Sequence, residues 1–118
     1  MRQLILGAAL AALLPFAAQA QDAAAGEKVF TACKACHAFG KNGVGPDLKG
    51  VIGRKAGTHE GYNYSAAMKN SGLTWDSATF MEYIKDPKAK VPGNKMIYAG
   101  LKDDKKIADL EAYLETQK

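Results

Sequence analysis

Apolar residues recur at three- and four-residue steps in separate stretches of the chain, the spacing of an amphipathic helix. Asp22 precedes the first stretch as a helix cap, and Asp86-Pro87 ends the third because proline cannot continue a helix. No run alternates between apolar and polar residues as a half-buried strand would. The pattern predicts an all-α chain with helices over 22–37, 66–70, 76–86 and 103–116.

Two long segments between these helices carry turn residues in place of apolar periodicity. Residues 39–61 are rich in glycine and include Pro46, and residues 88–100 hold Pro92-Gly93 and Met96. A structureless stretch of more than about 20 residues is uncommon in a compact domain unless it serves a site. The segment 39–61 is therefore predicted to wrap a bound ligand.

Residues 1–20 have the composition of a cleavable export signal. Arg2 gives a positive start, Leu4 to Phe16 is almost wholly apolar, and Ala18-Gln19-Ala20 resembles a small-residue cleavage site. The apolar run is shorter than the roughly 20 residues that a membrane-spanning helix needs. We expect cleavage after Ala20, export to the periplasm without a membrane anchor, and one mature domain over 21–118.

Charge and cysteine content exclude two broad classes. The formal net charge is +4, and the lysines are interleaved with acids, so the clustered basic stripe of a nucleic-acid-binding protein is missing. Only two cysteines are present, fewer than a disulfide-stapled exported domain usually carries. We therefore expect that a group other than a disulfide bond stabilises the small hydrophobic core. We also expect the protein to be a monomer.

The sequence Cys33-Lys34-Ala35-Cys36-His37 has the C-x-x-C-H spacing at which c-type haem is attached. On a helix, residues three and four apart share a face, so two thiols can bond to haem while the imidazole reaches the iron. A thioredoxin-like redox pair would follow a strand, and zinc would need a second Cys/His pair. An ordinary disulfide beside a histidine stays open on the pentapeptide alone.

A closed haem site needs a second axial ligand, and four side chains could supply it. Met68 and Met81 lie in helical stretches, where core packing is the usual role of methionine. His59 lies in the glycine-rich segment and is interpreted as solvent-facing. Met96 is the predicted ligand because it lies in a loop far enough along the chain to close over the opposite haem face. Its thioether would favour ferrous iron.

The order of these motifs along the chain resembles that of the class I cytochrome c family, which includes mitochondrial cytochrome c and bacterial periplasmic relatives. The resemblance covers nearly all of residues 21–118. It implies a fold in which the first and last helices pack together and the loops enclose one covalently bound haem. The segments that carry it are Gly26 to Phe30, Cys33 to His37, Gly45 to Leu48, Gly53 to Lys55, Gly61 to Ser65, Thr74-Trp75, Met81 to Tyr83, Pro92 to Met96 and Ala112 to Leu114.

The resemblance also implies roles for single residues. Cys33 and Cys36 would form the thioether links, and His37 and Met96 would be the axial ligands. The remaining haem contacts would be the Pro46 carbonyl on the His37 ring, the propionate donors Arg54, Tyr64 and Trp75, Tyr83 at the methionine sulfur, and Asn94 behind it.

A closed six-coordinate iron favours one-electron transfer over catalysis or gas binding. The resemblance implies transient docking to a quinol-oxidising complex or dehydrogenase as donor, and to an oxidase, reductase or reaction centre as acceptor. Lys88, Lys95 and Lys102 match family positions around the haem edge, although Ala32 and Asp103 replace lysines found in many mitochondrial members. Two alternatives stay open, a haem sensor or enzyme with an open iron and a thiol–disulfide oxidoreductase.

Overall fold

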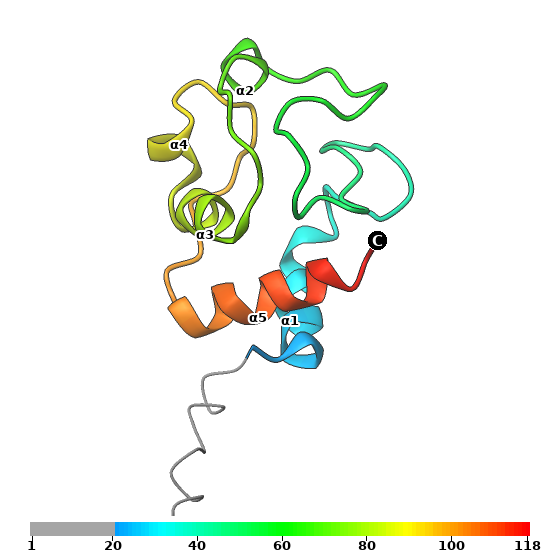
Figure 1. The fold of residues 1–118 in the computed structure, drawn as a ribbon, viewed down its shortest axis with the longest axis vertical. Coiled ribbons are helices and arrows are strands. Elements are labelled where there is room, and N and C mark those ends of the chain that lie inside the picture. The colour runs from blue at the N-terminus through cyan, green and yellow to red at the C-terminus, as the bar shows by residue number, and fades with distance from the viewer. Residues whose placement is uncertain (1–20) are drawn as a thin grey trace, which may run out of the picture.

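The computed structural model describes residues 21–118, and the predicted export signal lies outside that range. Figure 1 shows the helices in chain order among long connecting loops. No strand is formed in the described residues beyond one isolated bridge between Lys55 and Thr74, so the all-α prediction is confirmed. The elements are α1 (Ala23–Phe30), the 3-10 helix η3 (Thr31–Cys33), α2 (Ala66–Lys69), α3 (Ser77–Lys85), α4 (Pro87–Lys90) and α5 (Asp104–Glu115).

The helices begin where the sequence offers a capping side chain. Asp22 accepts the Ala25 amide at α1, Ser65 accepts the Met68 amide at α2, and Asp103 caps α5. One predicted helix end and one predicted loop are wrong. The first helix stops as an α-helix at Phe30 and tightens into η3, and α4 forms where only a loop was predicted.

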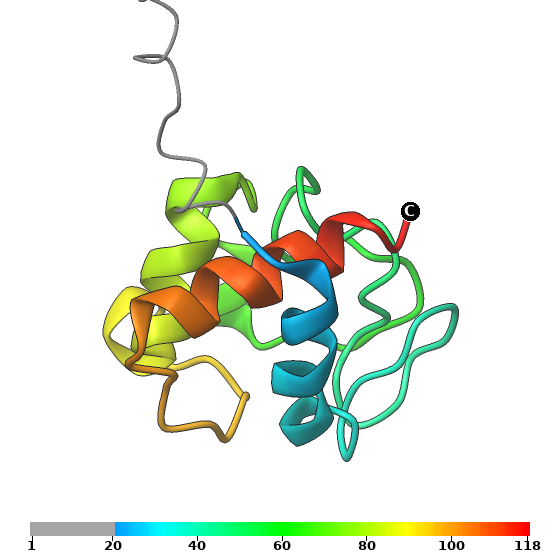
Figure 2. The ribbon, with the colours of Figure 1, turned by 90° about the horizontal axis from the view of Figure 1, so that it is seen from below.

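The first and last helices cross and form the base of the domain, as Figure 2 shows. Phe30 packs against Tyr113 with ring centroids 5.6 Å apart, and Ile107 and Leu110 are buried beneath the crossing. Gly26 makes the crossing possible, since a β-carbon there would lie 1.9 Å from the Asp109 carbonyl oxygen. The predicted packing of the first helix on the last is confirmed.

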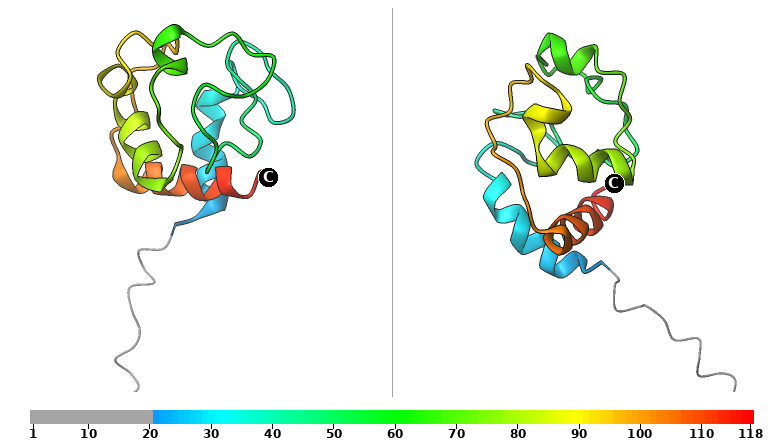
Figure 3. Two further views of the ribbon diagram at one scale, coloured as in Figure 1. Left: turned by 45° about the horizontal axis from the view of Figure 1, so that its top comes forward. Right: turned by 90° about the vertical axis from the view of Figure 1, so that its left-hand side faces the viewer.

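The loops occupy the end of the domain away from this crossing. Figure 3 shows residues 39–61 on one side, and α3, α4 and residues 91–101 on the other. Trp75 and Tyr83 are buried between these sides, with ring centroids 4.8 Å apart. The fold therefore holds two irregular segments face to face, so that each can present side chains to the space between them.

Candidate functional site

A cavity of about 370 Å³ lies between the two loop segments. Most of its wall is apolar, from residues such as Leu48, Val51 and Phe80. The predicted site residues come from seven separate segments of the sequence, and the structure brings every one of them to this cavity. They are Cys33, Cys36, His37, Pro46, Arg54, Tyr64, Trp75, Tyr83, Asn94 and Met96.

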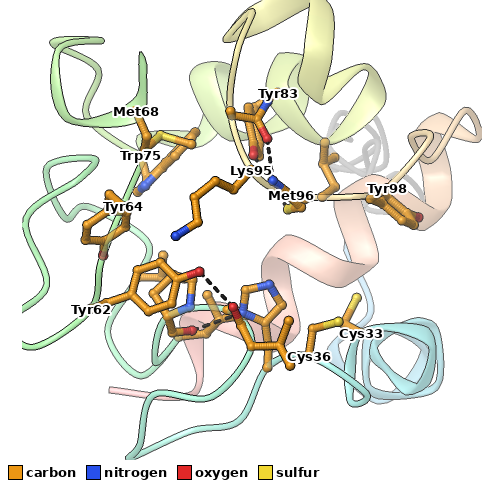
Figure 4. A pocket seen from close by; sticks show the side chains of 18 of the residues that line it. Cys33, Cys36, Tyr62, Tyr64, Met68, Trp75, Tyr83, Lys95, Met96 and Tyr98 are labelled. Atoms are coloured by element: carbon orange, nitrogen blue, oxygen red, sulfur yellow. Dashed lines mark hydrogen bonds between the residues drawn. The ribbon is translucent and has the colours of Figure 1, made fainter. Parts of the chain in front are cut away.

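A tight turn after η3 presents the two cysteines and His37 together. The amides of Cys36 and His37 both donate to the Cys33 carbonyl, at 3.2 and 2.9 Å. Both thiols are free, and Figure 4 shows them at one edge of the cavity. Burial, and secondarily the nearby Cys36, raises the pKa of the Cys33 thiol, which opposes the thiolate that a dithiol oxidoreductase uses.

The His37 ring is held in one orientation by the backbone. Its Nδ1 lies 3.0 Å from the Pro46 carbonyl oxygen, so Nδ1 carries the proton and Nε2 keeps its lone pair. Burial lowers the pKa of His37, partly offset by the bond to Pro46, and this favours the neutral imidazole that metals bind. The ring fits closely against Gly45, where a β-carbon would lie 2.4 Å from His37 Cε1.

Met96 is fixed by its neighbours on α3 and in its own loop. Its sulfur lies 3.5 Å from the Tyr83 hydroxyl, which donates to it, as Figure 4 shows. Its amide donates to Asn94 Oδ1 at 2.8 Å, while the Asn94 side-chain amide donates to the carbonyls of Pro87 and Val91. Burial raises the pKa of Tyr83 to about 12, so this hydroxyl remains a donor at physiological pH.

Arg54, Tyr64 and Trp75 supply the polar groups on another part of the wall. The Tyr64 oxygen accepts the His59 amide at 3.1 Å, which leaves its own proton free to donate. Arg54 donates to the Asp47 carbonyl at 2.8 Å and the Lys49 carbonyl at 3.3 Å, which anchors the guanidinium beside the cavity. An anionic group entering here would meet charged and neutral donors within an apolar pocket.

These walls fit a haem group. The cavity combines an oriented imidazole, a thioether, two free thiols, polar donors and an apolar lining. Across residues 21–118, no group of three or more His, Cys, Asp and Glu side chains comes together to hold a metal ion by itself. The described residues therefore do not provide the cluster of ligands that a structural zinc site would need.

The sequence interpretation missed the surroundings of His59 and Asp47. The His59 side chain is only 29% exposed, and its Nε2 lies 3.6 Å from Asp47 Oδ2. Its Nδ1 lies 3.4 Å from Arg54 Nη1, so the solvent-facing assignment is wrong for most of this ring. Asp47 is itself buried and is bound by the amides of Gly40 and Lys49, both at 2.8 Å. No periodicity in a glycine-rich loop signals such contacts.

Tyr62 was also missed as a neighbour of the cavity, whereas Lys95 was predicted near the haem edge but without the contacts it makes. Tyr62 donates to the Val44 carbonyl at 2.7 Å, and its ring lies 5.3 Å from Lys95 Nζ. Lys95 also donates to the Asn63 carbonyl, so it links the loop that carries Met96 to the glycine-rich loop. The bridge crosses the cavity in Figure 4.

Asp47→Asn is expected to destabilise the protein at neutral pH by about 1–3 kcal/mol, because the charged acceptor of two amides is lost. Burial of Asp47 opposes its ionisation, but those amides, His59 and Arg54 together hold its pKa below the ordinary value. The carboxylate's contribution is complete above the unfolded-state pKa and is lost as pH falls through the lower folded-state pKa.

Denaturant unfolding of both proteins over a series of pH values checks this expectation. The stability gap should close as the solution becomes more acidic. Glu60→Gln, at an exposed position in the same loop, is the matched control and should show no such gap. A gap that stays constant into strong acid would mean that the Asp47 charge is not what stabilises the loop.

Comparison with known proteins places this site in context. The family model described as cytochrome c matches residues 23–118. Cytochrome c2 of Blastochloris viridis is 54% identical over 118 residues, covering 98% of this chain and 93% of the relative. Cytochrome c-550 of Bradyrhizobium diazoefficiens is 58% identical over 95 residues, covering 78% and 70% respectively.

A solved structure gives the same result in three dimensions. Cytochrome cH from Methylobacterium extorquens superposes with a TM-score of 0.80 at 60% identity, covering 80% of this chain and 98% of that one. The similarity therefore extends through the fold as well as the sequence.

Proposed function

The chain belongs to the cytochrome c family and is an electron-transfer protein with a covalently bound c-type haem, and we propose that His37 and Met96 are its axial ligands. One observation carries the proposal. The imidazole and the thioether line a single apolar cavity, and both are held in place by hydrogen bonds to neighbouring groups. Cys33 and Cys36 at its edge would form the thioether links.

The bound haem supplies a reversible one-electron change at iron, and the protein's residues set the conditions for it. Pro46 orients the imidazole and raises its basicity through Nδ1. Tyr83 donates to the Met96 sulfur and Asn94 fixes the loop, so the thioether is preorganised. If His37 and Met96 both bound the iron, no coordination site would be left for a substrate, which is what an electron carrier requires.

We assign Arg54, Tyr64 and Trp75 to the haem propionates. Each lines the cavity and has an N–H or O–H group that can donate to a carboxylate. Burying a carboxylate is costly unless such donors meet it. The interactions of Arg54 and Tyr64 with Asp47 and His59 would then hold this donor set in position.

We also propose that the protein works in the periplasm after removal of residues 1–20. The apolar run and the small residues before Gln21 support this assignment. Within residues 21–118, no helix has the length and apolar character needed to cross a membrane. The mature domain would then cover residues 21–118.

Proteins of this kind dock transiently to redox partners. We propose that docking occurs at the cavity mouth, where Val44 and Ile97 are 74% and 94% exposed. Lys88, Lys95 and Lys102 would add positive charge near this apolar patch, and Lys88 donates to the Met96 carbonyl at 3.4 Å. The partners would be a quinol-oxidising complex or dehydrogenase and an oxidase, reductase or reaction centre.

Lys88→Glu and Lys102→Glu are each expected to slow electron transfer to an acidic-surfaced partner by roughly tenfold at low salt, because electrostatic steering is reversed locally. The second-order rate constant measured against ionic strength checks this. Lys106→Glu on α5 is the matched control, an exposed lysine that the family resemblance does not place around the haem edge. An equal loss in the control would point to overall charge rather than to this surface.

The absorption spectrum of the exported protein, oxidised and then reduced, tests the proposed ligation. We expect c-type haem bands and the weak far-red band of ferric haem bound by a thioether. Haem bands without the far-red feature would indicate an open or differently ligated iron, as in a sensor or enzyme. A folded protein without haem bands would instead favour a thiol–disulfide oxidoreductase that uses Cys33 and Cys36.

A further inference from the structure

Glu111 is a buried acid that the electron-transfer site does not use. It lies in α5 with 1% of its surface exposed. Its Oε1 accepts from the Ser77 hydroxyl at 2.9 Å and from the Gln21 side-chain amide at 3.2 Å. Its Oε2 has no hydrogen-bond partner among the described residues. Burying a carboxylate oxygen without a hydrogen-bond partner costs free energy, so we expect a further group that donates to Oε2.

The helix that carries Glu111 does not provide that donor. Lys105 in the first turn of α5 is exposed and pairs instead with Asp109 at 2.7 Å. Side chains three and four residues away on a helix are its neighbours, and none of these is positively charged. Around Glu111 they are Ile107, Ala108, Leu114 and Glu115.

The segment that approaches Glu111 from outside α5 is the start of the described chain. The Asp22 amide donates to Asp109 Oδ1 at 2.9 Å, and the Gln21 side chain reaches Glu111. Figure 2 shows this segment, blue, lying against α5 before it enters α1. Two consecutive residues are therefore anchored to the two buried acids of α5, and the Gln21 side chain, bonded to Glu111, tethers the Gln21 backbone nitrogen to the same region.

We propose that Glu111 binds the α-ammonium group that export processing creates at Gln21. The inference rests on the predicted cleavage after Ala20. Hydrolysis of the Ala20–Gln21 peptide bond by water gives a carboxylate on the released signal and an ammonium on Gln21. That ammonium has three donors and a positive charge, so it can satisfy Oε2 while the Gln21 side chain stays on Oε1. Processing would then complete an ion pair that holds α1, α3 and α5 together.

A thermodynamic cycle on the haem-loaded protein tests the pairing. Four proteins are compared: chains beginning at Gln21 or at Ala20, each with Glu111 or with Glu111→Gln. Glutamine keeps an acceptor for Ser77 and Gln21 but cannot accept from an ammonium at the second position. The retained Ala20 moves the charge away without altering α5.

In the chain beginning at Gln21, Glu111→Gln should lower the folding equilibrium constant about tenfold to hundredfold. Retaining Ala20 should have a comparable effect, and combining the two changes should add little. Glu115→Gln, exposed on the same helix, is the matched control and should leave the constant unchanged. Additive effects, or an unchanged or higher constant for Glu111→Gln alone, would overturn the proposal.

Acetylation of amines followed by mass spectrometry gives a second readout that does not depend on unfolding. The Gln21 α-amine should react several times more slowly than in the Glu111→Gln variant, with the lysines as internal reference. The intact mass of the exported protein separates this proposal from the haem function. Cleavage elsewhere, or loss of one ammonia through cyclisation of Gln21, would overturn the ammonium pairing, whereas the haem spectrum would still report the axial ligands.

Discussion

The protein with both Cys33 and Cys36 replaced by alanine is expected to be largely unfolded when no haem is bound. The cavity of about 370 Å³ lies among buried core residues, and Trp75, Phe80 and Tyr83 form part of its wall. If an unfilled cavity costs about 24 cal/mol per Å³, this one costs about 9 kcal/mol. That cost is comparable to the entire stability of a small domain, about 5–15 kcal/mol.

Far-ultraviolet circular dichroism and amide hydrogen exchange of the haem-free variant measure this outcome. The helical signal should fall to a minor fraction of that of the haem-loaded protein, and exchange protection in α1 and α5 should be lost. The control retains both cysteines and is produced with haem attachment, so the two samples differ only in the thiols and the group they hold. A haem-free variant with native helicity and protection would show that the polypeptide fills its own core.

The sequence predicted the fold best where local and long-range requirements agree. For α5, the apolar face and the Asp103 cap both favour a helix, and its observed bounds differ from the predicted ones by one residue at each end. For the first helix, the local apolar pattern favours a helix to His37, whereas contacts with the following loop favour a turn. The Cys33 carbonyl accepts both the Cys36 and the His37 amides, while the Cys36 carbonyl accepts the Gly45 amide from the following loop. The His37 bond is of the α-helical kind, but the Cys36 bond spans only three residues, as in η3, and the bond from Gly45 ties the turn to the loop, so the regular α-helix stops before its predicted end.

The missed helix α4 has a different cause. Asp86-Pro87 was interpreted as a helix terminator, which is correct for α3. Proline also suits the first turn of a new helix, because its missing N–H would have no partner there. Asp86 serves both helices, ending α3 and accepting the Ala89 amide at the start of α4. Apolar periodicity alone does not show that one helix ends and another begins at the same residue.

The site residues were found through motif order, whereas the missed contacts of residues such as Asp47 and Tyr62 are not encoded by the motifs that contain them. Met96 and His37 could be named because ligand chemistry restricts the residue type. The contact of His59 with Asp47 joins two ends of one irregular loop, and that of Gln21 with Glu111 joins the start of the described chain to α5. Such pairs arise from tertiary packing, so a single sequence carries no local signal for them.

Met96→Leu is expected to abolish the far-red thioether band of the oxidised protein, lower the reduction potential by roughly a few tenths of a volt, and allow carbon monoxide to bind the reduced protein. Leucine has a similar volume, so the loop held by Asn94 should keep its conformation. The sulfur that accepts from Tyr83 at 3.5 Å is lost, and with it the ligand that favours ferrous iron.

Two matched variants make the assignment decisive. Met81→Leu removes a thioether from α3 outside the cavity, and Met68→Leu removes one from the cavity wall. Both should retain the far-red band, keep a potential close to that of the unmodified protein, and exclude carbon monoxide. If Met68→Leu loses the band while Met96→Leu retains it, the axial ligand comes from α2, and Met96 only packs beneath Tyr83. If Met96→Leu alone loses it, the ligand is Met96, whose sulfur accepts from the Tyr83 hydroxyl and whose amide donates to Asn94 Oδ1.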